Sequence, residues 1–162
     1  MKKVLVVNGP NLNLLGMREP GVYGTGSLKE LLSVLRKKAR LMGVRLRTYQ
    51  SNHEGKLIDR LHRLRSGGFA AGRPAGNKYL GVIINPGALT HYSYSLRDAL
   101  KAVGLPAVEV HLSDIERREE FRKVSVIREV CIGQVKGMGP EGYERALHML
   151  LEHAGMPDTA AF

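Results

Sequence analysis

Two hydrophobic patterns alternate along the chain. Five short runs rich in β-branched residues have the character of buried strands: Val4 to Val7, Val44 to Tyr49, Val82 to Ile84, Val108 to Val110 and Val130 to Val135. The stretches between them carry apolar residues at helical spacing. Strands that alternate with helices predict an α/β fold with a five-stranded parallel sheet covered by helices on both faces.

The first predicted helix has the clearest limits. Ser27 and Glu30 have the spacing of a capping box, and Gly43 is suited to end the helix. Apolar stripes mark all four helices: Leu28, Leu31, Leu32, Leu35 and Ala39; Leu57, Ile58, Leu61 and Leu64, from about Glu54 to Gly67; Leu96, Ala99, Leu100 and Val103; and Tyr143, Ala146, Leu147, Leu150 and Leu151. Residues 67 to 79 show no period, so we expect a long loop there.

Length and composition favour one soluble domain. The chain has 162 residues, of which 43% are hydrophobic, and we expect a single domain over residues 1–153 followed by a tail at 154–162. No apolar run resembles a signal peptide or a membrane span, so we expect a cytoplasmic protein. The single cysteine, Cys131, lies between Val130 and Ile132, which predicts a buried, inert thiol.

The net charge of +10 predicts attraction to anions, either nucleic acid or small carboxylates and phosphates. Much of the charge lies in RKKAR (36 to 40) and RLHRLR (60 to 65), on the polar sides of predicted helices, which favours a solvated surface. The chain has no Trp and three Phe, so the stacking aromatics of a nucleic-acid platform are scarce.

Two familiar kinds of site are disfavoured. The stretch GMGPEG (137 to 142) matches the dinucleotide-binding pattern, but too little chain follows it for a nucleotide half-domain, so we interpret it as a strand-to-helix turn. The six histidines lack metal-ligand spacing, and we expect no metal.

Polar residues follow four of the predicted strands, and the ends of parallel strands meet at one edge of a sheet. They are Asn11, Arg18 and Tyr23 after the first strand, SNHEG (51 to 55) after the second, Asn85 and His91 after the third, and Glu109, His111 and Ser113 at the fourth. Each alone has an ordinary structural explanation, such as a core histidine at position 111 or a turn at Asn85. Together they predict a site.

The chemistry of this set points to an elimination. Glu109 and His111 face the same side of a strand, so the carboxylate can keep the imidazole protonated as a general acid. Arg18 beside Tyr23 favours the phenolate, which is a usable base. Backbone N–H groups near Leu112 and Ser113, together with Arg118 or Arg122, can hold a carboxylate. A base, an acid and a carboxylate clamp suggest proton abstraction beside a carbonyl with loss of a leaving group.

The chain resembles the type II 3-dehydroquinate dehydratases. The resemblance rests on NGPNLNLLGMREPGVYG, QSNHEGKLID, INPGALTHYSYSLRDAL, VEVHLSDIERREEFR and, more weakly, GMGPEGYERAL, which cover nearly the whole chain in order. It implies a flavodoxin-like three-layer αβα fold, a dodecamer built from trimers, and no cofactor. The implied reaction is the anti elimination of water from 3-dehydroquinate, through an enolate, to give 3-dehydroshikimate in the shikimate pathway of aromatic amino acid biosynthesis. Neither nucleic acid nor a membrane is an implied partner.

The resemblance also implies a role for each matched residue. Tyr23 is the base, His111 the acid that protonates the departing hydroxyl with Glu109 behind it, Arg18 the lid residue that assists Tyr23, and Asn11 the residue that positions a water or the enolate oxygen. The residues that bind the substrate are Asn85, His91, Leu112, Ser113 and Arg122, with Asp98 reaching in from a neighbouring subunit.

Two segments depart from the family pattern. The loop at 67 to 79 is longer than usual, and SVIREVCIGQVKG (125 to 137) places Gln134 and Lys136 where apolar residues are expected. The competing hypothesis from another class is a flavodoxin-like module that binds nucleotides or nucleic acid without catalysis. That module would leave Arg18, Tyr23 and His111 without a role.

Overall fold

A computed structural model describes residues 1–17, 25–65 and 78–156. Its centre is one sheet of five parallel strands: β1 (Lys3–Asn8), β2 (Arg45–Gln50), β3 (Tyr79–Asn85), β4 (Ala107–His111) and β5 (Gly133–Lys136). Their order in space is β2-β1-β3-β4-β5. This order is that of flavodoxin-like folds, so the predicted fold class is confirmed.

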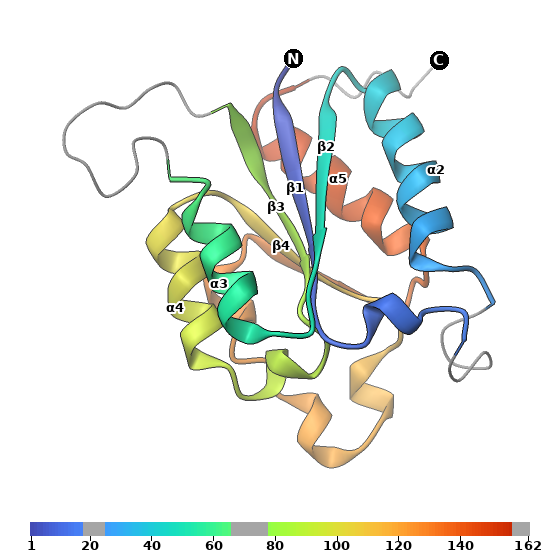
Figure 1. The fold of residues 1–162 in the computed structure, drawn as a ribbon, viewed down its shortest axis with the longest axis vertical. Coiled ribbons are helices and arrows are strands. Elements are labelled where there is room, and N and C mark those ends of the chain that lie inside the picture. Colours follow the sequence, from blue (N-terminus) through green and yellow to red (C-terminus); the bar gives the residue numbers. More distant parts are fainter. Residues whose placement is uncertain (18–24, 66–77, 157–162) are drawn as a thin grey trace.

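Helices cover both faces of the sheet (Figure 1). Helices α2 (Leu28–Leu41) and α5 (Glu141–His153) lie on one face, and α3 (Glu54–His62) and α4 (Tyr94–Val103) lie on the other. Alternate residues of β1 enter the two cores: Val4 and Val6 pack with the first pair of helices, and Leu5 and Val7 pack with the second. Each fully buried aliphatic side chain of this kind contributes about 1.5–3 kcal/mol to folding.

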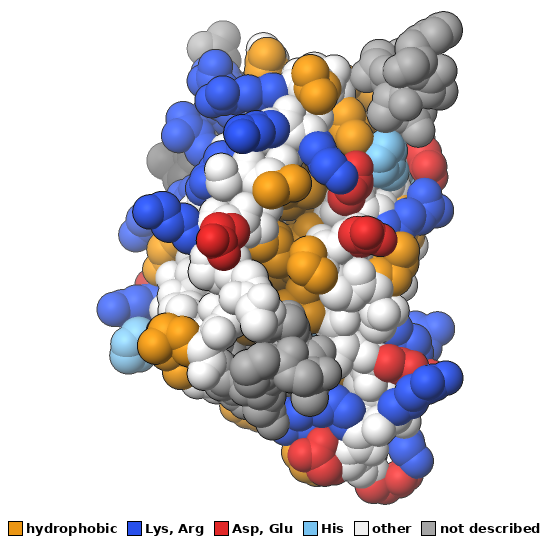
Figure 2. Space-filling view, turned by 90° about the vertical axis from the view of Figure 1, so that its right-hand side faces the viewer, with side chains coloured by type: hydrophobic (Ala, Val, Ile, Leu, Met, Phe, Trp, Pro, Cys, Tyr) orange, Lys and Arg blue, Asp and Glu red, His pale blue; other side chains and the backbone are white. Residues whose placement is uncertain are grey.

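Helix α2 begins as its sequence predicts. The Ser27 hydroxyl accepts the Glu30 backbone N–H at 3.2 Å, and the Glu30 carboxylate accepts the Ser27 N–H at 2.8 Å, which completes the capping box. The basic residues Arg36, Lys37 and Arg40 on this helix are exposed, as expected for a solvated face. Figure 2 looks onto the side of the molecule that carries α2 and shows many Lys and Arg side chains there.

The region around the last strand differs from the prediction. Strand β5 begins at Gly133 rather than at Val130, because Arg128–Val130 forms a short 3-10 helix, η5. The Ser125 hydroxyl stabilises this turn by accepting the backbone N–H groups of Ile127 and Arg128 at 3.3 and 3.1 Å. Cys131 is half-buried rather than fully buried.

Other expected limits also shift. Helix α3 ends at His62, before Leu64, and Tyr79 belongs to β3 rather than to a loop. The rest of the expected loop, residues 67–77, and the tail from 157 onward lie outside the described residues. The GMGPEG stretch is the turn between β5 and α5, as interpreted. In the described part of the chain, no helix has the length and apolar character needed to cross a membrane.

The strands bring three loops together at their carboxyl ends. Gly9, directly after β1, packs against the backbone that follows β3: a Cβ at this position would lie 2.4 Å from the Pro86 carbonyl oxygen. The Gly9 N–H also donates to the Asn85 carbonyl at 2.8 Å. A glycine is therefore required for the segments after β1 and β3 to form one continuous wall.

Candidate active site

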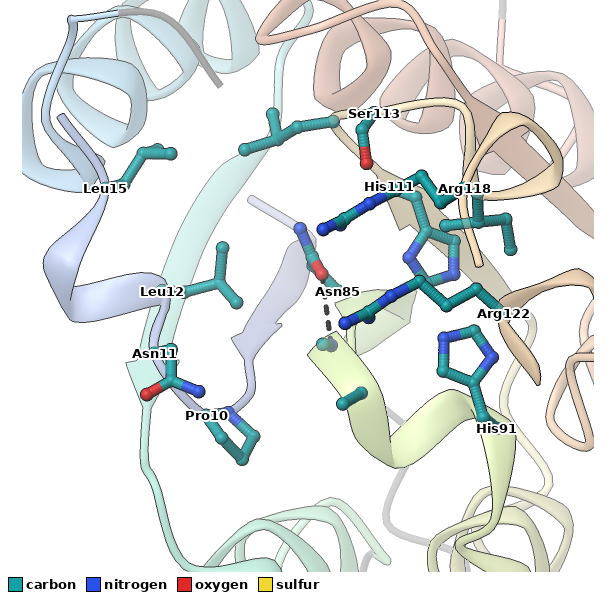
Figure 3. A pocket seen from close by; sticks show the side chains of 14 residues that line it. Pro10, Asn11, Leu12, Leu15, Asn85, His91, His111, Ser113, Arg118 and Arg122 are labelled. Atoms are coloured by element: carbon teal, nitrogen blue, oxygen red, sulfur yellow. Dashed lines mark hydrogen bonds between the residues drawn. The ribbon is translucent and has the colours of Figure 1, made fainter. Parts of the chain in front are cut away.

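A pocket of about 130 Å³ lies at the carboxyl ends of β1, β3 and β4. Figure 3 shows Asn11, Leu12 and Leu15 on one side of it and His91, His111, Arg118 and Arg122 on the other. The pocket brings together seven residues that the sequence predicted for the site: Asn11, Asn85, His91, His111, Leu112, Ser113 and Arg122. This is the position at which open α/β sheets bind ligands.

The strongest electrostatic feature of the site is the pair formed by Glu109 and His111 on β4. Glu109 Oε1 lies 2.6 Å from His111 Nε2, and the glutamate is fully buried. Burial by itself would raise the pKa of Glu109, but the hydrogen bond from His111, its positive charge and the hydroxyls of Thr90 and Ser125 hold that pKa below its usual value. An ionised Glu109 accepts the Nε2–H, which leaves Nδ1 of His111 to act in the pocket.

His91 presents a different nitrogen to the pocket. Its Nδ1 lies 2.7 Å from the Val124 carbonyl oxygen, which only accepts, so Nδ1 carries a proton and donates it. Burial lowers the pKa of His91, and this favours the neutral ring. Its Nε2 then offers a lone pair that can accept a hydrogen bond from a ligand hydroxyl.

Two asparagines from neighbouring strand ends are held differently: Asn85 is the last residue of β3, and Asn11 lies in the loop after β1. The Asn85 side chain is held on both atoms: Nδ2 donates to the Tyr143 hydroxyl at 3.1 Å, and Oδ1 accepts the Gly87 N–H at 3.2 Å. Asn11 is exposed, has a left-handed φ of 68°, and donates its backbone N–H to Asn52 Oδ1 at 2.9 Å. Asn52 comes from the polar stretch after β2, which thus supports the pocket without lining it.

Two guanidinium groups make one wall of the pocket cationic. Arg118 and Arg122 both line it and extend toward its interior (Figure 3). Glu119 lies outside the pocket lining and pairs with both, at 2.7 Å from Arg122 Nε and 3.7 Å from Arg118 Nε. From the sequence we expected one of the two arginines to meet a carboxylate. The structure brings both to the site, so Arg118 is an addition to the predicted binding residues.

Two predicted residues in the described ranges, Glu109 and Asp98, do not line the pocket. Glu109 reaches it only through His111, so it is a positioning residue rather than one that touches a ligand. Asp98 lies on α4 with its side chain 71% exposed and pairs with Arg97 at 3.1 Å. The other two predicted residues, Arg18 and Tyr23, lie outside the described residues. Within the described ranges, no cluster of His, Cys, Asp and Glu side chains is arranged to hold a metal ion.

Comparisons with known proteins agree with this geometry. The family model for class II dehydroquinases matches residues 2–151. Proteins named 3-dehydroquinate dehydratase from Bacillus cereus and Bacillus anthracis are each 51% identical over 152 residues, which is 94% of this chain and 97% of theirs.

Solved structures agree as well. The type II dehydroquinase from Butyrivibrio crossotus has a TM-score of 0.82 and 42% identity, covering 92% of this chain and 97% of that one. The one from Propionibacterium acnes has a TM-score of 0.82 and 37% identity, covering 94% and 97%. The chain therefore belongs to the class II dehydroquinase family.

Proposed function

We propose that the pocket dehydrates 3-dehydroquinate with Tyr23 as the base and His111 as the acid. The reaction itself, loss of water to give 3-dehydroshikimate in the shikimate pathway, is the activity of this hydro-lyase family. The single observation that carries the division of roles is the buried carboxylate of Glu109, 2.6 Å from an imidazole that lines a cationic pocket.

The base acts first. The Tyr23 phenolate removes a proton from the carbon beside the substrate ketone, and the electron pair moves into an enolate. Arg18 favours the phenolate, since a nearby positive charge lowers the pKa of a phenol. Support for both roles comes from the resemblance of residues 8 to 24 to the family pattern. Asn11 lies in the same sequence stretch and lines the pocket, where it would hold a water or the enolate oxygen.

The acid then completes the elimination. The enolate electrons return to form the double bond, and the hydroxyl on the opposite face of the ring leaves as water with the proton of His111 Nδ1. Glu109 stabilises the imidazolium before this step and accepts the Nε2–H throughout. General acid catalysis of this kind contributes about 10²–10⁴-fold to the rate.

The remaining residues would hold the substrate. Arg118 and Arg122, with the backbone amides of Leu112 and Ser113, would bind its carboxylate, because paired guanidinium groups and N–H donors suit an anion. His91 Nε2 and the Asn85 amide would bind its hydroxyls. No cofactor is needed, since each step is a proton transfer.

We also propose that one subunit completes the pocket of another, within a cytoplasmic dodecamer built from trimers. The support is an exposed apolar surface beside the site: Tyr92 and Tyr94 are 62% and 65% exposed, and Phe121 and Val124 are 59% and 61% exposed. Exposed apolar patches of this kind mark protein interfaces. Asp98 on α4 is close in sequence to Tyr94, and it would reach the neighbouring pocket.

The test is a spectrophotometric assay of the purified protein with 3-dehydroquinate, following the conjugated enone of 3-dehydroshikimate in the presence of a chelator. We expect turnover that survives chelation and falls by roughly 10²–10⁴-fold in Tyr23→Phe, with the oligomer unchanged on gel filtration. Tyr79→Phe, at the far end of the sheet, is the matched control. Full activity in Tyr23→Phe would remove Tyr23 as the base.

A further inference from the structure

The Glu109 carboxylate receives donors on both oxygens from four separate residues. Oε1 is bonded by the Thr90 hydroxyl and, at 2.6 Å, by His111 Nε2. Oε2 is bonded by Gln134 Nε2 at 3.0 Å and by the Ser125 hydroxyl at 2.9 Å. Gln134 is one of the two residues whose polarity departs from the family pattern, and Glu109 is the hydrogen-bond partner of its amide.

The direction of the Ser125 hydrogen bond follows from counting its lone pairs. Its oxygen already accepts two backbone N–H groups, those of Ile127 and Arg128. A hydroxyl oxygen has two lone pairs and one proton, so the proton is what Ser125 offers to Glu109. The Thr90 hydroxyl lies 2.9 Å from the Ser125 oxygen, but that oxygen has no free lone pair left to accept its proton. Thr90 therefore donates to Glu109.

These donors occupy all the acceptor sites of the Glu109 carboxylate. An ionised carboxylate offers about four lone-pair sites, and the four donors occupy them. A protonated Glu109 would instead need an acceptor. The Ser125 oxygen already accepts two backbone N–H groups and cannot accept a third, so it favours the ionised form. The Gln134 amide is assigned with its nitrogen toward Glu109 because the carboxylate only accepts.

Strand pairing and hydrogen bonds to neighbouring segments hold both donors in place. Gln134 is the direct neighbour of Glu109 across the pairing of β4 with β5. The neighbours of Ser125 in the sequence are hydrogen-bonded to Thr90 and His91. The Val126 N–H donates to the Thr90 carbonyl at 2.8 Å, and the Val124 carbonyl accepts from His91 at 2.7 Å. The segment from Val124 to Val126 thereby positions both the Glu109 carboxylate, which bonds His111, and the ring of His91.

We propose that Gln134 and Ser125 are positioning residues for the dehydration, which hold Glu109 as an oriented carboxylate and so keep His111 protonated on the nitrogen that faces the pocket. The inference rests on the role of His111 proposed above. It assigns catalytic consequences to two residues that do not line the pocket.

Loss of a donor should shift the pH at which activity appears. Besides His111, the titratable groups that act on Glu109 are His91 on η2 (Gly87–His91) and Cys131 before β5, with Arg122 acting on His91. The lowered pKa of His91 and the raised pKa of Cys131 favour the uncharged form of both. Each donor to Glu109 lowers the pKa of that carboxyl, so removing one raises it. As the pH falls, Glu109 is then protonated at a higher pH than before, and its charge no longer supports His111.

The experiment measures kcat and KM against pH for Gln134→Met, which keeps the length of the side chain and removes the donor. We expect the acid limb of kcat to move up by about one pH unit, the maximal kcat to fall about tenfold, and KM to change less than about twofold. Gln134→Glu, which places a second carboxylate against Glu109, should move the limb further. Gln50→Met, the same change at the end of β2, should leave the limb in place.

A second pair of variants tests the same inference if Gln134→Met does not fold. Ser125→Ala removes the hydroxyl, and Ser125→Thr restores it, so we expect an upward shift of the acid limb in the first and its reversal in the second. An unmoved acid limb in folded Gln134→Met and Ser125→Ala, in an enzyme that still depends on His111, would overturn this inference alone. Full kcat in His111→Asn would instead overturn the proposed acid.

Discussion

Two polar clusters, one around the buried Glu109 and one around the buried Tyr143, lie near the ends of the strands and differ in how completely their hydrogen bonds are formed. The charged cluster comprises Thr90, Glu109, His111, Ser125 and Gln134. The amide cluster comprises Asn8, Asn85 and Tyr143, in which the Tyr143 hydroxyl donates to Asn8 Oδ1 at 2.6 Å and accepts from Asn85 Nδ2 at 3.1 Å. Both oxygens of Glu109 are saturated, whereas Asn8 Nδ2 has no hydrogen-bond partner in the described part of the chain.

The difference follows from what each group costs when it is left incomplete. An unpaired neutral amide atom costs about 1–3 kcal/mol, while an uncompensated buried charge costs more and shifts its pKa instead. The fold can therefore tolerate one orphan atom on Asn8 but not on Glu109. A change in the charged cluster should thus appear mainly in catalysis, and a change in the amide cluster mainly in stability.

The largest effect is expected from Glu109→Gln. The side chain keeps its shape but loses its charge, so the imidazolium of His111 is no longer stabilised. We expect kcat to fall by roughly 10²–10³-fold with little change in KM, because general acid catalysis is what is lost. Steady-state kinetics against pH measure it, and Glu116→Gln, at an exposed position, is the control. A loss of less than about threefold would show that the charged cluster is structural.

Tyr143→Phe should have a smaller effect on catalysis and a clear effect on stability. The ring remains, but Asn8 loses its donor and Asn85 loses the oxygen to which it donates. Burial raises the pKa of Tyr143, so the hydroxyl is a donor at every working pH. We expect unfolding to become easier by about 1–3 kcal/mol in urea titrations, and kcat to stay within about threefold because Gly87 still holds Asn85. A large fall in kcat at unchanged stability would reverse the contrast between the clusters.

The two clusters also differ in how far the sequence predicted them. Glu109 and His111 were found because two residues that are two apart on a strand share a face. The sequence also predicts Asn85, but it indicates Tyr143 only as part of the apolar stripe of its helix, because the contact of Tyr143 with Asn8 spans 135 positions. The sequence marks Gln134 only as a departure from the family pattern, since its contact with Glu109 depends on the register of β4 and β5.

Errors in the predicted elements have equally local causes. The expected strand at Val130 has the right composition, but side-chain bonds from Ser125 favour a turn at Arg128–Val130 instead. Such side-chain-to-backbone hydrogen bonds cannot be inferred from the spacing of apolar residues. The sequence does not decide between Arg118 and Arg122, because their spacing does not reveal that both side chains reach one pocket.

The smallest effect is expected at Cys131, which lies beside the charged cluster without belonging to it. Burial, with the charge of Glu109, raises the pKa of this thiol to about 12. At pH 8 the thiolate fraction is then small, so we expect alkylation by iodoacetamide to be roughly 10³-fold slower than for a free thiol, and fast labelling after denaturation in urea. Cys131→Ala should keep kcat within about twofold. Rapid labelling of the folded protein would mean that the segment between Ser125 and β5 opens readily. Ser125 and Gln134 could not then hold Glu109 continuously, and the contrast with the amide cluster would have to rest on charge alone.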